Sequence, residues 1–133
     1  MHQCDIKQPD IILVGGQSAI LHHSLNNERF FCFEQYAFLL GTDPDAIVLV
    51  INLFDEISYI KRAINFIESV LDTCVIACVL SVVRQKEFLN MDMIYDKQRI
   101  DFLIRELNKP VFEFNVQIEE LCSHIIDFFG GIE

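Results

Sequence analysis

Four short runs of mostly apolar residues alternate with stretches in which apolar residues recur every three or four positions. Because successive side chains of a strand point to opposite faces, runs that are apolar at successive positions predict strands buried on both faces. These runs lie at residues 10–16, 46–51, 74–83 and 111–114. Apolar residues at three- and four-residue spacing predict amphipathic helices. Such spacing covers residues 57–71, 100–107 and 116–129, and residues 33–40 have the composition of a short helix.

Local signals mark where these helices begin and end. Asn52 and Asp55 precede the helix at 57–71 and offer side-chain oxygens that can cap its first turn. Gly41 and the turn sequence at 42–45 are expected to end the helix at 33–40, because glycine readily takes the left-handed conformation. The last helix is expected to turn one apolar side inward. That side is formed by Ile118, Leu121, Cys122, Ile125 and Phe129.

The alternation of strands and helices predicts an α/β fold. Parallel neighbouring strands need crossover connections, and helices supply them. We therefore expect an open, doubly wound, mostly parallel sheet of about four strands with helices on both faces. The 133 residues suit a single domain covering residues 1–133. Both edges of so small a sheet must be covered by helices and loops of the chain or by a second subunit.

Composition and charge narrow the choice of partner. Hydrophobic residues make up 52% of the chain, which is high for a small domain with much surface. We therefore expect an apolar surface that contacts a protein partner or a second copy of the chain. Twenty acidic residues against ten basic ones give a net charge of −10, which repels a phosphate backbone and an anionic membrane. Nucleic acid and membranes are not expected as partners.

The sequence predicts neither a targeting segment nor a membrane span. The longest apolar stretch, residues 46–53, is far shorter than the roughly 20 residues of a spanning helix. The N-terminus lacks the basic and apolar regions of a secretory signal, which favours a cytoplasmic location. The five cysteines lack paired spacing. Cys74, Cys78 and Cys122 lie in apolar segments, as expected for reduced core thiols rather than for a zinc or redox pair.

Ligands of open α/β sheets bind beyond the carboxyl ends of the strands, and three strand exits carry polar residues that could contact a ligand. After the first strand, backbone N–H groups and polar side chains could bind an anion, or the glycines could simply form a tight turn. After the second strand, the polar residues favour helix capping, with contact to a metal or a cationic substrate as the alternative. The candidate ligand-binding residues are Gly15, Gly16, Gln17, Ser18, Asn52, Asp55 and Glu56.

Other polar residues are interpreted as structural. Ser81 with Arg84 could meet an anion after the third strand, although a solvated arginine is the commoner case. His22 and His23 have no further ligands at metal-binding spacing. His124 has no identifiable third group that would orient it for nucleophilic catalysis. We therefore predict no catalytic residue, no metal site and no cofactor.

Three segments carry a resemblance to a known family. They read PDIILVGGQS at 9–18, LLGTDPDAIVL at 39–49 and NLFDEISYIKR at 52–62. Over most of residues 9–83, the chain resembles the C-terminal part of peptide maturation system proteins from clostridial ribosomal-peptide gene clusters. Those proteins are similar to a P-loop family that includes D-glutamate N-acetyltransferases and, more distantly, to dethiobiotin synthetases.

The resemblance implies a P-loop NTPase-like half-domain without the phosphate-binding loop, because the relatives carry that loop before the equivalent of Pro9. Where the relatives have an acidic residue near the metal and the phosphates, this chain has Gly15. Gly16 and Gln17 match the relatives, and Ser18 replaces a glycine. The missing acid argues against metal-assisted chemistry at this loop.

The resemblance leads us to expect a non-catalytic or accessory protein in the maturation of a ribosomally synthesised peptide. Such a protein would act with a partner chain or as a homo-oligomer, and a precursor peptide is among its candidate partners. The alternative is a ligand-sensing or protein-interaction module of the doubly wound class with no role in peptide modification. A self-sufficient acyl- or phosphoryl-transfer enzyme ranks last, because the strand exits offer no cationic cradle for phosphate.

Overall fold

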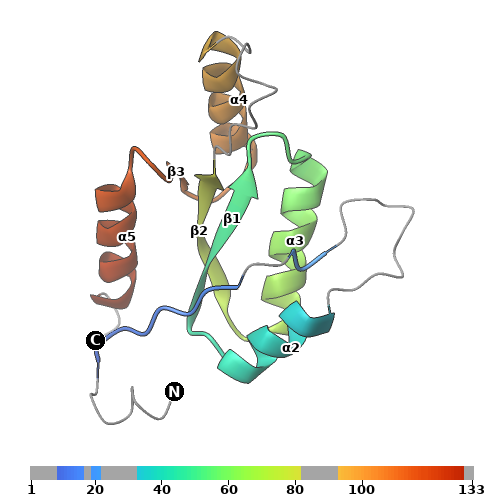
Figure 1. Cartoon of the computed structure of the whole chain (residues 1–133), viewed down its shortest axis with the longest axis vertical. Helices are drawn as coiled ribbons and strands as arrows, with labels where there is room; N and C mark the ends of the chain where they lie inside the picture. Colours follow the sequence, from blue (N-terminus) through green and yellow to red (C-terminus); the bar gives the residue numbers. More distant parts are fainter. Residues whose placement is uncertain (1–8, 17–18, 22–32, 82–92, 131–133) are drawn as a thin grey trace. The chain divides into compact units, whose positions relative to one another are not determined.

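The structure, a computed structural model, describes residues 9–16, 19–21, 33–81 and 93–130 (Figure 1). The chain divides into two compact units, Met1–Asp43 and Pro44–Glu133, and the sheet belongs to the second. The predictions made for His22, His23 and Arg84 lie outside the described residues.

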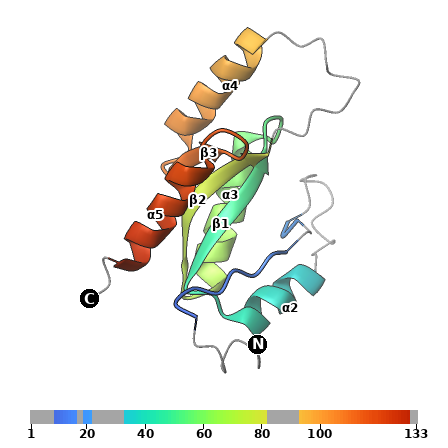
Figure 2. The same ribbon diagram turned by 60° about the vertical axis from the view of Figure 1, so that its left-hand side comes forward.

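The second unit is built on a parallel sheet with helices on both faces. Its strands β1 (Ala46–Asn52), β2 (Cys74–Ser81) and β3 (Val111–Glu113) lie in the order β1-β2-β3. Helix α3 (Ile57–Val70) lies on one face and helix α5 (Ile118–Gly130) on the other, as Figures 1 and 2 show. Helix α4 (Met93–Glu106) falls between β2 and β3 in the chain. The predicted open α/β architecture is confirmed.

Strand β2 forms the centre of the core. Residues 75–80 are all buried, as expected for an apolar run with a strand on either side. The register with β1 shifts between Ile47 and Val48, which leaves Ile76 of β2 without an opposite residue, at a β-bulge. His124 of α5 places its Nε2 atom 3.0 Å from the Ile76 carbonyl oxygen. Because a carbonyl only accepts, this ring nitrogen must carry the hydrogen.

Helix α3 forms where apolar residues recur at helical spacing, as the sequence predicts. Its inward side is buried against the sheet. The buried residues are Ile60, Ala63, Ile64 and Ile67. The helix ends at Leu71, whose extended backbone leaves the helical path and whose N–H still donates to the Ile67 carbonyl at 3.0 Å.

Glu68, near the end of α3, ties this helix to the start of β2. One carboxylate oxygen accepts the N–H of Val75 at 3.0 Å and the Nζ atom of Lys109 at 2.7 Å. The Lys109 hydrogen bond lowers the pKa of Glu68, while partial burial opposes the shift. The contact joins residues from three places in the chain at the amino edge of the sheet, where β2 begins.

Among the described side chains, few residues of helices α4 and α5 are buried in the core. At the end of α4, Leu103 and Leu107 are buried, with exposed fractions of 0% and 1%. On α5, Leu121 packs with Ala77 and Val79 of β2. These contacts place α5 over the middle of the sheet.

The predicted inward side of α5 is only partly covered. Leu121 is buried, Ile125 and Phe129 are half-buried, but Ile118 and Cys122 are exposed, so the prediction is wrong for these two residues. The physical reason is the small surface beneath the helix. β3 has only three residues, and the first turn of α5 has little sheet to cover.

The first unit contains helix α2 (Phe33–Thr42). The helix ends within the predicted turn at 42–45, but it continues past Gly41, so the prediction is wrong for Gly41 alone. Asp43 ends it instead, with a φ of 43° and an N–H that donates to the Leu39 carbonyl at 3.0 Å. Aspartate tolerates the left-handed conformation better than most residues with a side chain, which allows it the role expected of glycine.

Residues 10–16 form no strand, and the prediction of a buried strand there is wrong. The exposed fractions of Ile11, Ile12, Leu13 and Val14 are 40%, 47%, 84% and 52%. An apolar run becomes a strand only when a neighbouring strand completes its backbone hydrogen bonds. No other strand is described in the first unit, so this requirement is not met within it.

Candidate functional site

The loop after β1 lies at the carboxyl edge of the sheet, where ligands of this fold class bind. The Asp55 Oδ2 atom accepts the N–H of Asn52 at 2.8 Å, and the Asp55 N–H donates to the Asn52 carbonyl at 3.1 Å. Together these two bonds close a turn over residues 52–55. The Asp55 carboxylate therefore holds the loop that leads from the strand into α3.

Glu56 occupies the N-cap position of α3. Its backbone is extended, with φ −65° and ψ 136°, and its carbonyl accepts the N–H groups of Tyr59 at 2.9 Å and Ile60 at 3.1 Å. Its side chain makes no cap hydrogen bond and instead accepts the Ser58 hydroxyl at 3.4 Å. The prediction that Asn52 or Asp55 caps the helix is wrong in position, because the turn places Glu56 there.

Arg99 of α4 holds the same loop from the other side. Its Nε atom donates to the Leu53 carbonyl at 3.1 Å and its Nη2 atom to the Asp55 carbonyl at 2.6 Å. Its guanidinium carbon also lies 5.1 Å from the centre of the Phe102 ring. The sequence did not single out Arg99, because its partners lie more than forty residues away in the chain. The cation serves two backbone carbonyls and so fixes the loop.

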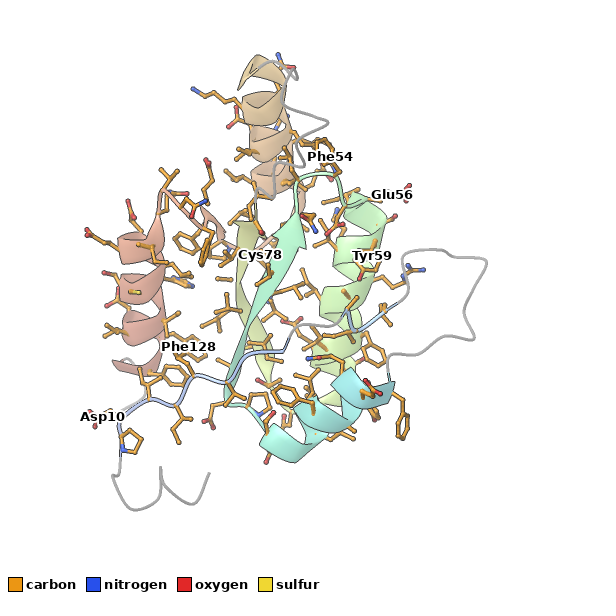
Figure 3. The ribbon with its side chains drawn as sticks, in the orientation of Figure 1. Asp10, Phe54, Glu56, Tyr59, Cys78 and Phe128 are labelled. Carbon is orange, nitrogen blue, oxygen red and sulfur yellow. The ribbon has the colours of Figure 1, made fainter. Side chains whose placement is uncertain are left out.

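The loop after β1 turns one apolar side chain inward and one outward. Leu53 is 3% exposed and Phe54 is 54% exposed. Figure 3 shows Phe54 and Glu56 at the end of the sheet where α3 begins. The result is a loop held by the Asp55 carboxylate and the Arg99 guanidinium, with its aromatic ring at the surface.

The exit of β3 presents further apolar side chains at the same edge of the sheet. The N–H of Phe114 donates to the Leu80 carbonyl at 3.2 Å, which places Phe114 beside the end of β2. Phe114, Val116 and Ile118 have exposed fractions of 52%, 71% and 47%. None of these residues was predicted as part of a site, although the alternation of apolar and polar residues over 114–118 was available as a signal.

The predicted site residues belong to two different units. Asn52, Asp55 and Glu56 come together in the loop after β1. Gly15 and Gly16 belong to the first unit, where both are exposed. A Cβ atom at Gly16 would collide with the side chain of Gln35 on α2, so a close approach requires glycine there. Gln17 and Ser18 lie outside the described residues.

The thiols and the histidine of the second unit have structural surroundings. Burial raises the pKa of the Cys78 thiol to about 11, which keeps it protonated and unreactive. Cys74 is half-buried, and Cys122 is exposed, so the expectation of a core thiol is wrong for Cys122. His124 is half-buried and oriented by the Ile76 carbonyl rather than by a catalytic partner.

Within the ranges given above, no three histidine, cysteine, aspartate or glutamate side chains gather in a way that could hold a metal ion. Among the same residues, no helix has the length and apolar character needed to cross a membrane.

The chain matches no protein-family model, no curated protein and no solved structure.

Proposed function

We propose that this chain is a non-catalytic accessory protein in the maturation of a ribosomally synthesised peptide, acting through contacts with a protein partner or a second copy of itself. One observation carries the proposal. The carboxyl edge of the sheet, where this fold class binds its ligands, presents the exposed apolar side chains of Phe54, Phe114 and Val116. Exposed apolar groups gathered on a small domain mark surfaces that contact other proteins.

The polar groups at this edge support a binding role over a chemical one. The Asp55 carboxylate accepts a backbone N–H, and the Arg99 guanidinium donates to two backbone carbonyls. A general base or an anion-binding cation acts by contact with its substrate, whereas the hydrogen bonds of these two groups are made to the backbone of the loop. They give the edge a fixed shape, and a fixed shape lowers the entropy lost on binding.

The outer edge of β1 offers a second way to contact a protein. In the sheet of the second unit β1 is an edge strand, and residues 46–51 carry no charge. Val50 is 66% exposed. A long apolar edge strand is a template for a strand from another chain, since its outward N–H and C=O groups can pair. This edge supports association with a partner or with a second copy.

The resemblance to clostridial peptide maturation proteins supplies the process. It rests on the segments at 9–18, 39–49 and 52–62. The second and third of these segments run through β1 and into α3. The alternative, an interaction or ligand-sensing module outside peptide modification, shares the same surfaces and differs only in the process served.

Deletion of the gene in the organism that encodes it tests the proposal. The precursor peptide should still be made, and the mature modified peptide, measured by mass spectrometry, should be lost and return on complementation. An unchanged yield of mature peptide would assign the chain to the alternative. In a separate calorimetric titration, binding of ATP, GTP or acetyl-CoA with magnesium by the purified full chain would contradict the non-catalytic part of the proposal.

A further inference from the structure

The connection between β3 and α5 forms an apolar surface, which we call the β3–α5 platform and define as residues 113–120. Its three apolar side chains, Phe114, Val116 and Ile118, alternate along the chain with polar ones. Val116 is 71% exposed and Phe114 52% exposed. Such exposure is unusual for neighbouring large apolar residues in a small protein, because each exposed side chain forgoes the free energy of burial.

Hydrogen bonds within the platform fix the backbone that carries these side chains. The Glu113 carbonyl accepts the N–H groups of Val116 at 3.1 Å and Gln117 at 2.9 Å. In return, the Gln117 Oε1 atom accepts the N–H of Glu113 at 3.1 Å. The Gln117 carbonyl then accepts the N–H of Leu121, at 3.0 Å, as α5 begins. The connection is a closed turn, so a partner that binds it need not order it.

Acidic residues border the apolar part of the platform. Glu119 and Glu120 lie in the first turn of α5, and both are exposed. Glu113 precedes Phe114 and is half-buried. No basic residue occurs within residues 113–120. The platform therefore combines apolar anchors with negative charge, and the ligand that complements it carries apolar side chains and positive charge.

We propose that the β3–α5 platform binds a peptide segment in which basic residues flank apolar ones. The apolar side chains of the segment cover Val116 and Phe114, and its lysine or arginine side chains meet Glu119 and Glu120. This inference deepens the proposed function and rests on it for the biological source of the segment, a precursor peptide. The charge pattern disfavours a second copy as occupant, since a copy brings the same carboxylates.

A fluorescein-labelled synthetic peptide with lysine pairs alternating with leucine and phenylalanine serves as the probe. Its binding to the purified full chain is followed by fluorescence anisotropy. A matched peptide with glutamate in place of lysine tests the sign of the charge. The wild-type chain is expected to bind the lysine peptide saturably and the glutamate peptide not at all. Failure to bind the lysine peptide would overturn the inference.

Paired variants test whether the platform is the site. Val116→Ser should weaken binding about tenfold, as expected for a central apolar anchor. Ile104→Ser, which makes the same kind of change at an exposed position of α4, should leave binding unchanged. Glu119→Gln with Glu120→Gln should weaken binding about threefold. The matched control is Asp72→Asn with Asp127→Asn, at two other exposed acids. Equal losses in platform and control variants would show non-specific charge attraction and overturn the inference.

Two further readouts separate the other occupants and the proposed function. If Val116→Ser converts a dimer into a monomer in a mass measurement, the surface belongs to a second copy and the inference fails. Binding of the wild-type chain to neutral phosphatidylcholine vesicles would assign the surface to a membrane, with the same consequence. If the probe does not bind but gene deletion still abolishes mature peptide, the inference fails and the proposed function stands. If the probe binds but deletion has no effect on the mature peptide, the proposed function fails and the inference about the platform stands.

Discussion

Strand β2 and the segment at residues 10–16 are both rich in apolar residues, but the first is buried and the second is exposed. Both are short apolar runs that favour a strand. In β2, Val75, Cys78 and Leu80 are fully buried. In the other segment, Leu13 is 84% exposed and no strand forms. An apolar run therefore indicates the capacity to form a strand, and its neighbours decide whether the strand exists.

Two strands and two side chains make hydrogen bonds with β2. β1 and β3 pair with it on either side. Glu68 accepts the N–H of Val75 where β2 begins, and His124 donates to the carbonyl of Ile76, the residue at the register shift with β1. Because of these contacts, we expect substitutions in and around β2 to lower the free energy of unfolding more than substitutions in residues 10–16.

The largest expected difference comes from truncating one leucine in each region. Leu80→Ala leaves a cavity in the core and should lower the free energy of unfolding by about 2–5 kcal/mol. Leu13→Ala should change it by no more than about 0.5 kcal/mol, because an exposed side chain loses few contacts. Urea unfolding of both variants measures the pair. A large loss for Leu13→Ala would show that residues 10–16 are buried in solution.

A smaller loss is expected when the bulge loses its donor. His124→Ala leaves the Ile76 carbonyl without its side-chain partner and should lower the free energy of unfolding by about 1 kcal/mol. Ser123→Ala, at the exposed neighbouring position, is the control and should have little effect. If the two variants are equally stable, the hydrogen bond to the bulge contributes nothing.

The tie between Glu68 and β2 predicts a pH dependence of stability. The pKa of Glu68 is lowered in the folded state from its ordinary value of 4.5. Its stabilising contribution is therefore present above pH 4.5 and is lost as the pH falls through the lower folded value. In urea unfolding at a series of pH values, wild type should be more stable than Glu68→Gln near neutrality. The gap should narrow on acidification, and a gap that widens would contradict the assignment.

Thiol labelling compares the two regions without changing stability. The Cys78 thiol, buried and with a pKa of about 11, should not react with iodoacetamide in the folded chain. A cysteine introduced by Leu13→Cys should react quickly, and the exposed Cys122 provides an internal standard. Peptide mapping by mass spectrometry identifies each labelled site. Equal labelling of Cys78 and the introduced thiol would remove the contrast between the regions.

The sequence predicted the parts of the fold that depend on local periodicity. Apolar runs predicted β1 and β2, and helical spacing predicted α3. The alternation of strands and helices predicted that neighbouring strands run parallel. The strand at residues 10–16 failed because pairing depends on a neighbour that the run itself does not specify. Gly41 failed as a helix end because Asp43 can also adopt a positive φ.

The candidate site was predictable only in part. The sequence located Asn52, Asp55 and Glu56 at a strand exit, because fold class alone fixes where strands end. It did not show that Arg99 holds this loop, since that contact joins residues 44 and 46 positions apart. Nor did it show that Val116 is exposed, since the shortness of β3 becomes evident only in the structure.

If the chain acts through the apolar side chains at the carboxyl edge of the sheet, replacing them should abolish peptide maturation. Complementation of the deletion strain with a Phe114→Ser, Val116→Ser double variant tests this claim, with Ile104→Ser as the matched control and thermal unfolding to verify folding. We expect the control to restore the mature peptide and the double variant to leave it absent. Full restoration by a folded double variant would contradict the claim.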